Sequence, residues 1–243
     1  MENLEKEHLP VDVKRKIESI LAKHKIESHT LSNTNLTNND AMLDFDKKEI
    51  RDKQIMLDPA KTIMSKTDAR GVIEYANDYF MEISGYEEYE LMGKPHNVIR
   101  HPDMPKVIFK LLWERLKEGK NIHAIVKNLA KDGSYYWVIT DFETKYDNNA
   151  NIIAYYARRK AAPANAVFQI EKLYKTLRSI EQTQSMEVAE RYFLGMLEEK
   201  KMTYDDLILS ILNINEETLN SYFNKDTNKT TKKKGFMGRL FGK

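Results

Sequence analysis

The densest group of polar side chains lies in HNVIRHPDMP, residues 96–105. Two histidines, an arginine, an aspartate and two prolines leave three kinds of site open: a metal or heme ligand set, a catalytic pair, or a rigid loop that grips a cofactor. Arg100 offers a planar fork of donors that suits phosphate. Pro102 and Pro105 restrict the backbone, so the loop would be ordered before a ligand arrives.

The rest of the sequence narrows these alternatives. There are no cysteines, which excludes disulfides, thiolate metal sites, cysteine nucleophiles and cysteinyl flavin adducts. No nucleophile has a base beside it, and no paired-carboxylate, G-x-G-x-x-G or phosphate-loop pattern occurs. His96 and His101 are separated by the loop itself and make a poor metal cluster. We therefore expect a protein that is not an enzyme.

Charge is distributed unevenly along the chain. The whole sequence has a net charge of +2, whereas residues 225–243 hold seven Lys or Arg against one Asp. Because the excess positive charge belongs to a terminal peptide rather than a folded face, we do not expect nucleic-acid binding. No apolar run approaches the roughly 18 residues of a membrane-spanning helix, and the start lacks the apolar core of a signal peptide. A cytoplasmic location is expected.

The elements that position the loop follow from hydropathy periods. A strand pair comes first, short helices follow, and a longer helix begins after Pro105 and ends before Gly119. Three further strands close the unit. The expected strands span residues 61–67, 72–77, 122–130, 134–146 and 152–160. This order predicts an α+β fold, with a five-stranded antiparallel sheet and helices on one face.

The chain divides into five expected parts. The sheet domain is preceded by an N-terminal helix and a flexible linker rich in Ser, Thr and Asn. It is followed by a region of short helices, where Thr203 and Asp206 form a capping box and Asn215 caps another helix, and by a basic amphipathic tail. The parts are 1–27 (helix), 28–57 (linker), 58–162 (sheet domain), 163–224 (helical region) and 225–243 (tail).

Three stretches together carry a family resemblance: SGYEEYELMGKPHNVIRHPDMP, LLWERLKEG and VKNLAKDGSYYWV. With this order of elements, the chain resembles a PAS domain over roughly residues 60–160. More narrowly, it resembles the FAD-binding PAS domains of aerotaxis receptors of the Aer type and of bipartite energy-taxis proteins. The resemblance implies a sensor that holds FAD non-covalently and signals its redox state to a chemoreceptor or similar partner. Whether the chain forms a homodimer stays open.

The resemblance also implies site residues. It assigns FAD binding to Arg100, His101 and Asp103, and it associates Trp113 with the flavin pocket. Asn128, on an expected strand, offers a donor and an acceptor to a flavin edge, and its neighbour Lys127 would point the opposite way. Structural interpretations compete with these roles. Asp103 would cap the following helix, Trp113 would fill the core, and His96 would be a structural hydrogen-bonding residue.

Two other functions remain open for such a domain. One is a heme sensor, with His101 or His123 as the axial ligand. The other is a cofactor-free interaction module whose cavity is filled with side chains.

The tail sequence KKKGFMGRLFGK predicts a separate activity. As a helix it would place four apolar residues on one arc, with basic residues beside them: Phe236, Met237, Leu240 and Phe241. This pattern suits the plane of an anionic membrane. The stretch is similar to the C-terminal membrane-targeting helix of the cell-division ATPase MinD. We therefore expect these residues to bind a membrane and to hold the protein peripherally on the inner membrane face; docking on a partner protein is the alternative.

Overall fold

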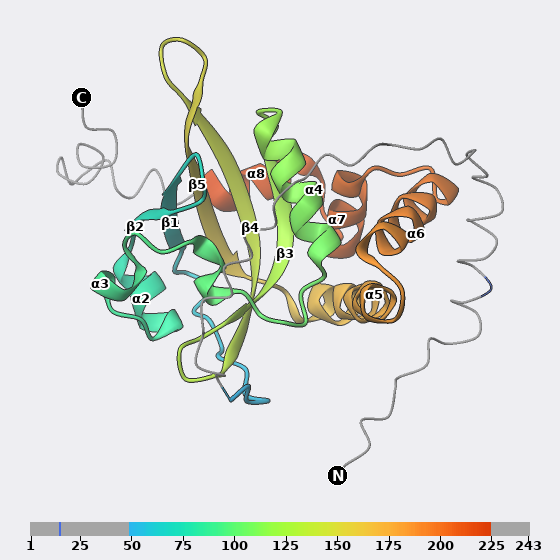
Figure 1. Cartoon of the computed structure of the whole chain (residues 1–243), viewed down its shortest axis with the longest axis horizontal. Coiled ribbons are helices and arrows are strands. Elements are labelled where there is room, and N and C mark those ends of the chain that lie inside the picture. Colours follow the sequence, from blue (N-terminus) through green and yellow to red (C-terminus); the bar gives the residue numbers. More distant parts are fainter. Residues whose placement is uncertain (1–14, 16–48, 225–243) are drawn as a thin grey trace.

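The computed structural model describes Arg15 and residues 49–224 (Figure 1). The expected N-terminal helix (except Arg15), most of the expected linker and the basic tail lie outside the described residues. The residues predicted to bind a membrane, Phe236, Met237, Leu240 and Phe241, lie there too, so their role stays a prediction. No helix in the described part of the chain is long and apolar enough to cross a bilayer.

A five-stranded antiparallel sheet forms the centre of the described region (Figure 1). Every neighbouring pair is antiparallel, and the spatial order is β2-β1-β5-β4-β3. Alternating burial along β1 shows the period of two that a half-buried strand requires. The predicted α+β fold and its antiparallel sheet are confirmed. The strands are β1 (Ile63–Asp68), β2 (Ile73–Ala76), β3 (Ile122–Leu129), β4 (Tyr135–Tyr146) and β5 (Ile152–Ala161).

Four helical elements between β2 and β3 lie on the side of the sheet that carries the cavity described below. The first is capped as expected, because Asn77 Oδ1 accepts a hydrogen bond from the Phe80 amide at 3.0 Å. The last begins after Pro105 and ends just before Gly119, as its sequence indicates. The elements are α2 (Asp78–Ser84), α3 (Glu88–Leu91), η1 (His96–Ile99) and α4 (Lys106–Lys117).

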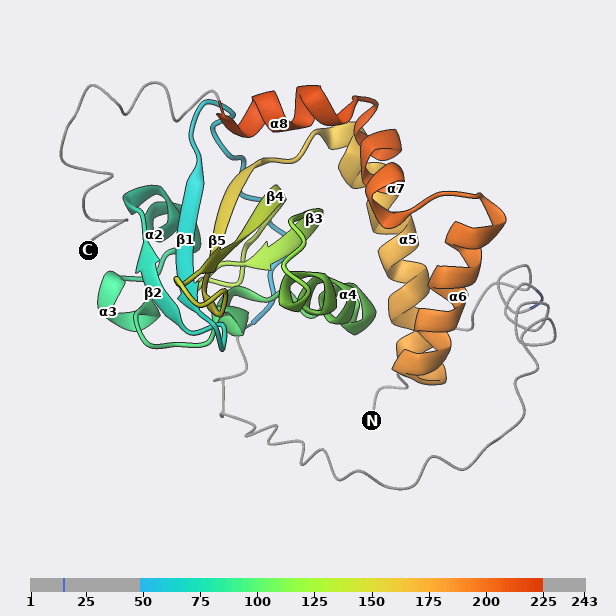
Figure 2. The ribbon, with the colours of Figure 1, turned by 90° about the horizontal axis from the view of Figure 1, so that it is seen from above.

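The helical region covers the opposite face of the sheet (Figure 2). Trp137 of β4 stacks on Tyr174, with ring centroids 6.3 Å apart. The ring centroids of His123 of β3 and Phe223 are 5.7 Å apart. The expected Thr203–Asp206 capping box is present. We call these elements the C-terminal helices: α5 (Ala164–Thr183), α6 (Met186–Glu199), α7 (Tyr204–Leu212) and α8 (Glu216–Asn224). Helices therefore cover both faces of the sheet, whereas the sequence predicted helices on one.

The end of the expected linker is part of the fold. Arg51 N donates to the Gly133 carbonyl at 2.9 Å, and Ile55 N donates to the Tyr135 carbonyl at 2.7 Å. A side chain at position 133 would collide with the Glu49 carbonyl, so glycine permits this close approach. The predicted linker, 28–57, therefore extends too far at its C-terminal end. The polar composition of this segment gives no sign that its backbone pairs with residues at the start of β4.

Candidate functional site

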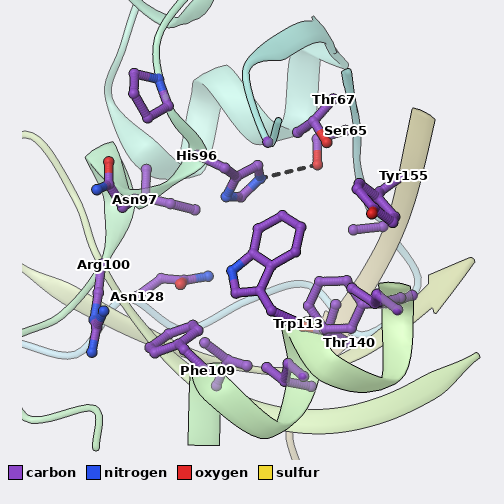
Figure 3. Close-up of a pocket in the computed structure, with 18 of the residues that line it drawn as sticks. Ser65, Thr67, His96, Asn97, Arg100, Phe109, Trp113, Asn128, Thr140 and Tyr155 are labelled. Atoms are coloured by element: carbon purple, nitrogen blue, oxygen red, sulfur yellow. Dashed lines mark hydrogen bonds between the residues drawn. The ribbon is translucent and has the colours of Figure 1, made fainter. Parts of the chain in front are cut away.

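A cavity of about 400 Å³ lies between the sheet and α4 (Figure 3). Side chains of β1, β3, β4 and β5 form one wall, and α4 together with residues 95–100 forms the other. Strand alternation decides which residues line it. Asn128 and Thr140 face the cavity, whereas Lys127 and Trp137 face α5. The expectation that Lys127 and Asn128 point in opposite directions is confirmed.

Three of the predicted site residues meet at this cavity: Arg100, Trp113 and Asn128. The Arg100 guanidinium lies 4.2 Å from the centre of the Phe109 ring, close enough for a cation–π contact. The Trp113 indole meets Tyr155 edge-on, with centroids 5.3 Å apart. Figure 3 shows Arg100, Trp113 and Asn128 arranged around the same space.

His101 and Asp103 lie outside the cavity lining. The backbones of Arg100 and Asn128 pair as a short antiparallel bridge, so the side chain after Arg100 points to the other side of the strand. There His101 Nδ1 accepts a hydrogen bond from the Asp103 amide at 3.1 Å, and Asp103 forms an ion pair with Lys127 at 2.7 Å. The structure does not bring these two residues together with the other three.

Asp103 does not cap α4, so that alternative interpretation is wrong. The N-cap residue is Pro105, which provides no side-chain hydrogen bond. The Val107 amide in the first turn instead donates to Glu181 Oε1 of α5 at 2.9 Å. The capping carboxylate comes from a residue 74 positions later, which local sequence patterns cannot reveal.

The two heme-ligand candidates also lie outside the lining. His123 Nε2 faces Asp141 Oδ1 at 3.3 Å on the opposite face of the sheet. In the described part of the chain, no group of three or more His, Asp or Glu side chains is arranged to hold a metal ion.

A buried arginine is the cavity residue that sequence reasoning missed. Arg159 of β5 is only 3% exposed; its Nη1 donates to Ser65 Oγ at 2.9 Å and its Nη2 to His96 Nε2 at 2.9 Å. Among the described residues it has no carboxylate partner, and burial lowers the pKa of Arg159 to about 10. The strand period does indicate that this side chain faces inward, because Arg159 lies two and four residues after the buried Ala157 and Tyr155.

Two buried polar groups on the wall also lack partners. Asn128 Nδ2 and Thr140 Oγ1 have no hydrogen bond of good geometry among the described residues, although the Asn128 side chain is close enough to the Tyr136 hydroxyl to oppose the rise that burial causes in the pKa of Tyr136. A buried polar group without a partner costs roughly 1–3 kcal/mol. The site therefore combines aromatic walls with unsatisfied polar groups and one buried positive charge, which suits a flat polar ligand.

Two histidines, the buried His101 and the half-buried His96, predict destabilisation in mild acid. Burial, with the nearby charge of Arg159, lowers the pKa of His96 to about 3; burial, with the charge of Lys127, lowers that of His101 to about 4. Both are neutral in the fold, so their contribution is complete above the unfolded pKa of about 6.5 and is lost as pH falls toward the folded values. Between about pH 7 and about pH 5 each should cost about 2 kcal/mol of unfolding free energy.

Urea denaturation at several pH values measures this loss. His96→Gln should flatten the pH dependence, and a stability that stays constant between about pH 7 and about pH 5 would contradict buried neutral histidines.

Gly71 sets the position of Trp113. Its φ is +83°, and a Cβ atom there would lie 3.0 Å from Trp113 Cη2. Gly71→Ala should lower the unfolding free energy by about 1–2 kcal/mol through backbone strain, and it should also displace the indole. Gly93→Ala is a matched control, because its φ is +74° and no atom lies within 4 Å of its Cβ.

Both variants should lose stability in denaturant titrations, but only Gly71→Ala should alter Trp113 emission in a Trp137→Phe background. Identical emission from the two variants would show that Gly71 does not position the indole.

Comparison with known proteins identifies the domain. Residues 73–157 match the family model described as the PAS fold. The aerotaxis receptor of Escherichia coli (strain K12) is 42% identical over 116 residues, which are 48% of this chain and 23% of the receptor. A nitrogen fixation regulatory protein of Klebsiella pneumoniae is 27% identical over 43% of this chain and 21% of its own. The chain therefore matches only about a fifth of the length of these relatives.

Solved structures to which the chain is similar include the PAS domain of a protein from Colwellia psychrerythraea, with a TM-score of 0.38 and 20% identity over 42% of this chain and 86% of that one. A light-oxygen-voltage domain gives a TM-score of 0.43 and 20% identity over 46% of this chain and 86% of that one. The family match and the sheet with its covering helices lead to one conclusion. Residues 73–157 of the sheet domain match the PAS fold, and the domain is similar to part of the aerotaxis receptor.

Proposed function

We propose that this PAS domain is a redox sensor that holds FAD non-covalently in the cavity and signals to a chemoreceptor or another partner, as in aerotaxis or energy taxis. One observation carries the proposal: the cavity wall presents the unsatisfied Asn128 amide together with a buried guanidinium, that of Arg159, which has no carboxylate partner among the described residues. The resemblance to FAD-binding aerotaxis domains and the similarity to the aerotaxis receptor support it.

The residues present fit a flavin. The cavity volume of about 400 Å³ falls within the range of about 300–1,000 Å³ that is typical of small-molecule sites. Phe109, Trp113 and Tyr155 offer aromatic surfaces to a flat ring system. A flavin edge carries both donors and acceptors, which an amide and a guanidinium can match. Arg100, half-buried at the same cavity, offers a cation to a pyrophosphate.

A bound flavin would supply the electron transfer, and the protein's own residues would provide binding, orientation and charge. Arg159 stays protonated at neutral pH, because its pKa of about 10 lies well above neutrality. It therefore provides a fixed positive charge inside the cavity and favours a more negative ligand state. Asn128 lies on β3, so a reorientation of its amide would act directly on a strand that also contacts α7.

The alternatives have less support. A heme sensor ligated by His101 or His123 would need a histidine aimed into the cavity, and both lie elsewhere. A cofactor-free module would need side chains to fill the cavity, which has a volume of about 400 Å³.

Arg100 tests which part of the ligand the protein recognises. If Arg100 binds the pyrophosphate, Arg100→Ala should weaken FAD binding by about tenfold, the lower end of the effect of a charge-assisted hydrogen bond. Riboflavin lacks the pyrophosphate, so its affinity should change little. Equilibrium titration of the full chain with each ligand measures both effects.

The control is Arg191→Ala, which removes an exposed arginine on α6. If Arg100→Ala binds FAD as tightly as the wild type, the phosphate role is wrong. If neither FAD nor riboflavin binds the wild-type chain, the proposed flavin function itself fails.

A further inference from the structure

Helix α4 is shared between the cavity and the C-terminal helices. Trp113 and other apolar residues on one side line the cavity. On the side that faces the C-terminal helices, Arg115 pairs with Asp205 of α7 at 2.6 Å; Lys110, which also borders the cavity, pairs with Glu190 of α6 at 2.6 Å. Figure 2 shows α4 beside β3 and next to α5 and α6. A displacement of α4 would therefore change both the cavity and the contacts with the C-terminal helices.

The start of α4 is held by a carboxylate from α5. Glu181 Oε1 accepts the hydrogen bond of the Val107 amide at 2.9 Å, and the Glu181 side chain is only 3% exposed. Its negative charge lies at the positive end of the α4 dipole, where it is favourable. A buried carboxylate that loses such a donor is costly, so the position of α4 and the position of α5 depend on each other.

The same part of α5 also holds the loop that leads into α4. Arg178 Nε donates to the Pro102 carbonyl at 3.0 Å, and Arg178 Nη1 lies 3.4 Å from Glu181 Oε2. This loop starts at Arg100, which lines the cavity. Burial lowers the pKa of Arg100, and the charge of Glu181 opposes that shift. Glu181 therefore acts on two parts of the cavity wall.

The remaining polar contacts between α4 and the C-terminal helices are weaker anchors. The Lys110 and Asp205 side chains are 36% and 43% exposed, and their partners Glu190 and Arg115 are half-buried, so solvent weakens both ion pairs. Glu181 is the buried one. Its bond to Val107 is the contact that a shift of α4 would affect most strongly.

We propose that Glu181 couples the cavity to α5 through its hydrogen bond to the Val107 amide at the start of α4. A ligand that fixes α4 and Arg100 preserves the Val107–Glu181 bond and holds α5 in place. Loss of the ligand loosens α5. Because coupling between two sites is reciprocal, loosening α5 also weakens ligand binding. The proposal relies on the proposed function only for the identity of the ligand, FAD.

The coupling can be tested without any ligand. Hydrogen exchange of α5 amides is measured in the full chain for the wild type, Trp113→Ala, Glu181→Ala and the double variant. Trp113→Ala should raise α5 exchange about threefold and Glu181→Ala about tenfold, while the double variant stays within about twofold of Glu181→Ala. Exchange rates in the double variant that equal the product of the two single effects would overturn the coupling.

Two controls keep this test interpretable. Gln182→Ala alters an exposed neighbour on α5 and should leave exchange unchanged, and β1 amides should exchange equally in all variants. If Glu181→Ala does not fold, Glu181→Met replaces it, because a side chain of similar size fills the same space and cannot accept the Val107 hydrogen bond. A similar rise in α5 exchange is then expected, and no rise would overturn the proposal.

The same exchange measurement with added FAD tests whether the ligand acts on α5 through Glu181. FAD should slow α5 exchange in the wild type by at least about threefold, and this effect should disappear in Glu181→Ala even where flavin absorbance shows that FAD is bound. Equal slowing in both proteins would overturn the role of Glu181. If no FAD binds the wild type, the proposed function fails, and the Trp113–Glu181 comparison still decides the coupling.

Discussion

Replacing Arg159 with methionine is expected to weaken FAD binding by about 10- to 150-fold, which corresponds to a charge-assisted hydrogen bond of about 1.5–3 kcal/mol. The ligand-free protein should keep its stability or gain some. Arg159 is a buried cation that no carboxylate compensates within the described residues, and an apolar side chain of similar size removes that desolvation cost. Opposite effects on affinity and stability distinguish a binding residue from a purely structural one.

The neighbouring arginine is the matched control for this experiment. Arg158 points to the other face of the sheet and forms an ion pair with the buried Asp141. Arg158→Met should therefore lower the unfolding free energy and leave FAD affinity unchanged, the reverse of the Arg159 pattern. FAD titration and urea denaturation of both variants provide the measurements. Wild-type FAD affinity in Arg159→Met would remove Arg159 from the binding site.

The second large effect is expected in tryptophan fluorescence. Trp113 lines the cavity, whereas Trp137 stacks on Tyr174 on the opposite face of the sheet. In a Trp137→Phe background, FAD should quench the emission of Trp113 strongly, because the indole and the flavin would be in contact. The reciprocal protein, Trp113→Phe, should retain partial FAD binding and show weaker quenching of Trp137.

Unchanged emission of Trp113 after FAD is shown to bind would mean that this residue only fills the core. Flavin absorbance of the same sample establishes occupancy, so the outcome does not depend on the assumption that FAD has bound.

The sheet could be predicted because its signals are local. Alternating burial, turn residues and helix caps such as Asn77 each act within a few positions, so the strands and their order along the chain follow from the sequence. The periods of α4 and β3 also place Trp113 and Asn128 on inward faces, whereas Arg100, which lies in a loop, could be assigned only from the family resemblance.

What could not be predicted depends on contacts between distant segments. In α5, apolar residues such as Ile170, Leu177 and Ile180 recur at helical spacing. This pattern predicts that the helix buries one face, but not that this face covers the second side of the sheet. The cap that Glu181 gives to α4 joins residues 74 positions apart. The backbone of Arg100 pairs with β3, which fixes the direction in which successive side chains point. The His101 side chain therefore points away from the cavity. Arg159 was overlooked because arginine is usually exposed.

The central claim, that the cavity holds a redox-active flavin, is tested most directly by the visible absorption spectrum of the purified full-length chain. The spectrum is recorded before and after chemical reduction and again after incubation with FAD. We predict the two bands of an oxidised flavin, their loss on reduction, and the release of FAD when the protein is denatured. A Soret band, or no flavin bands even after incubation with FAD, would contradict it.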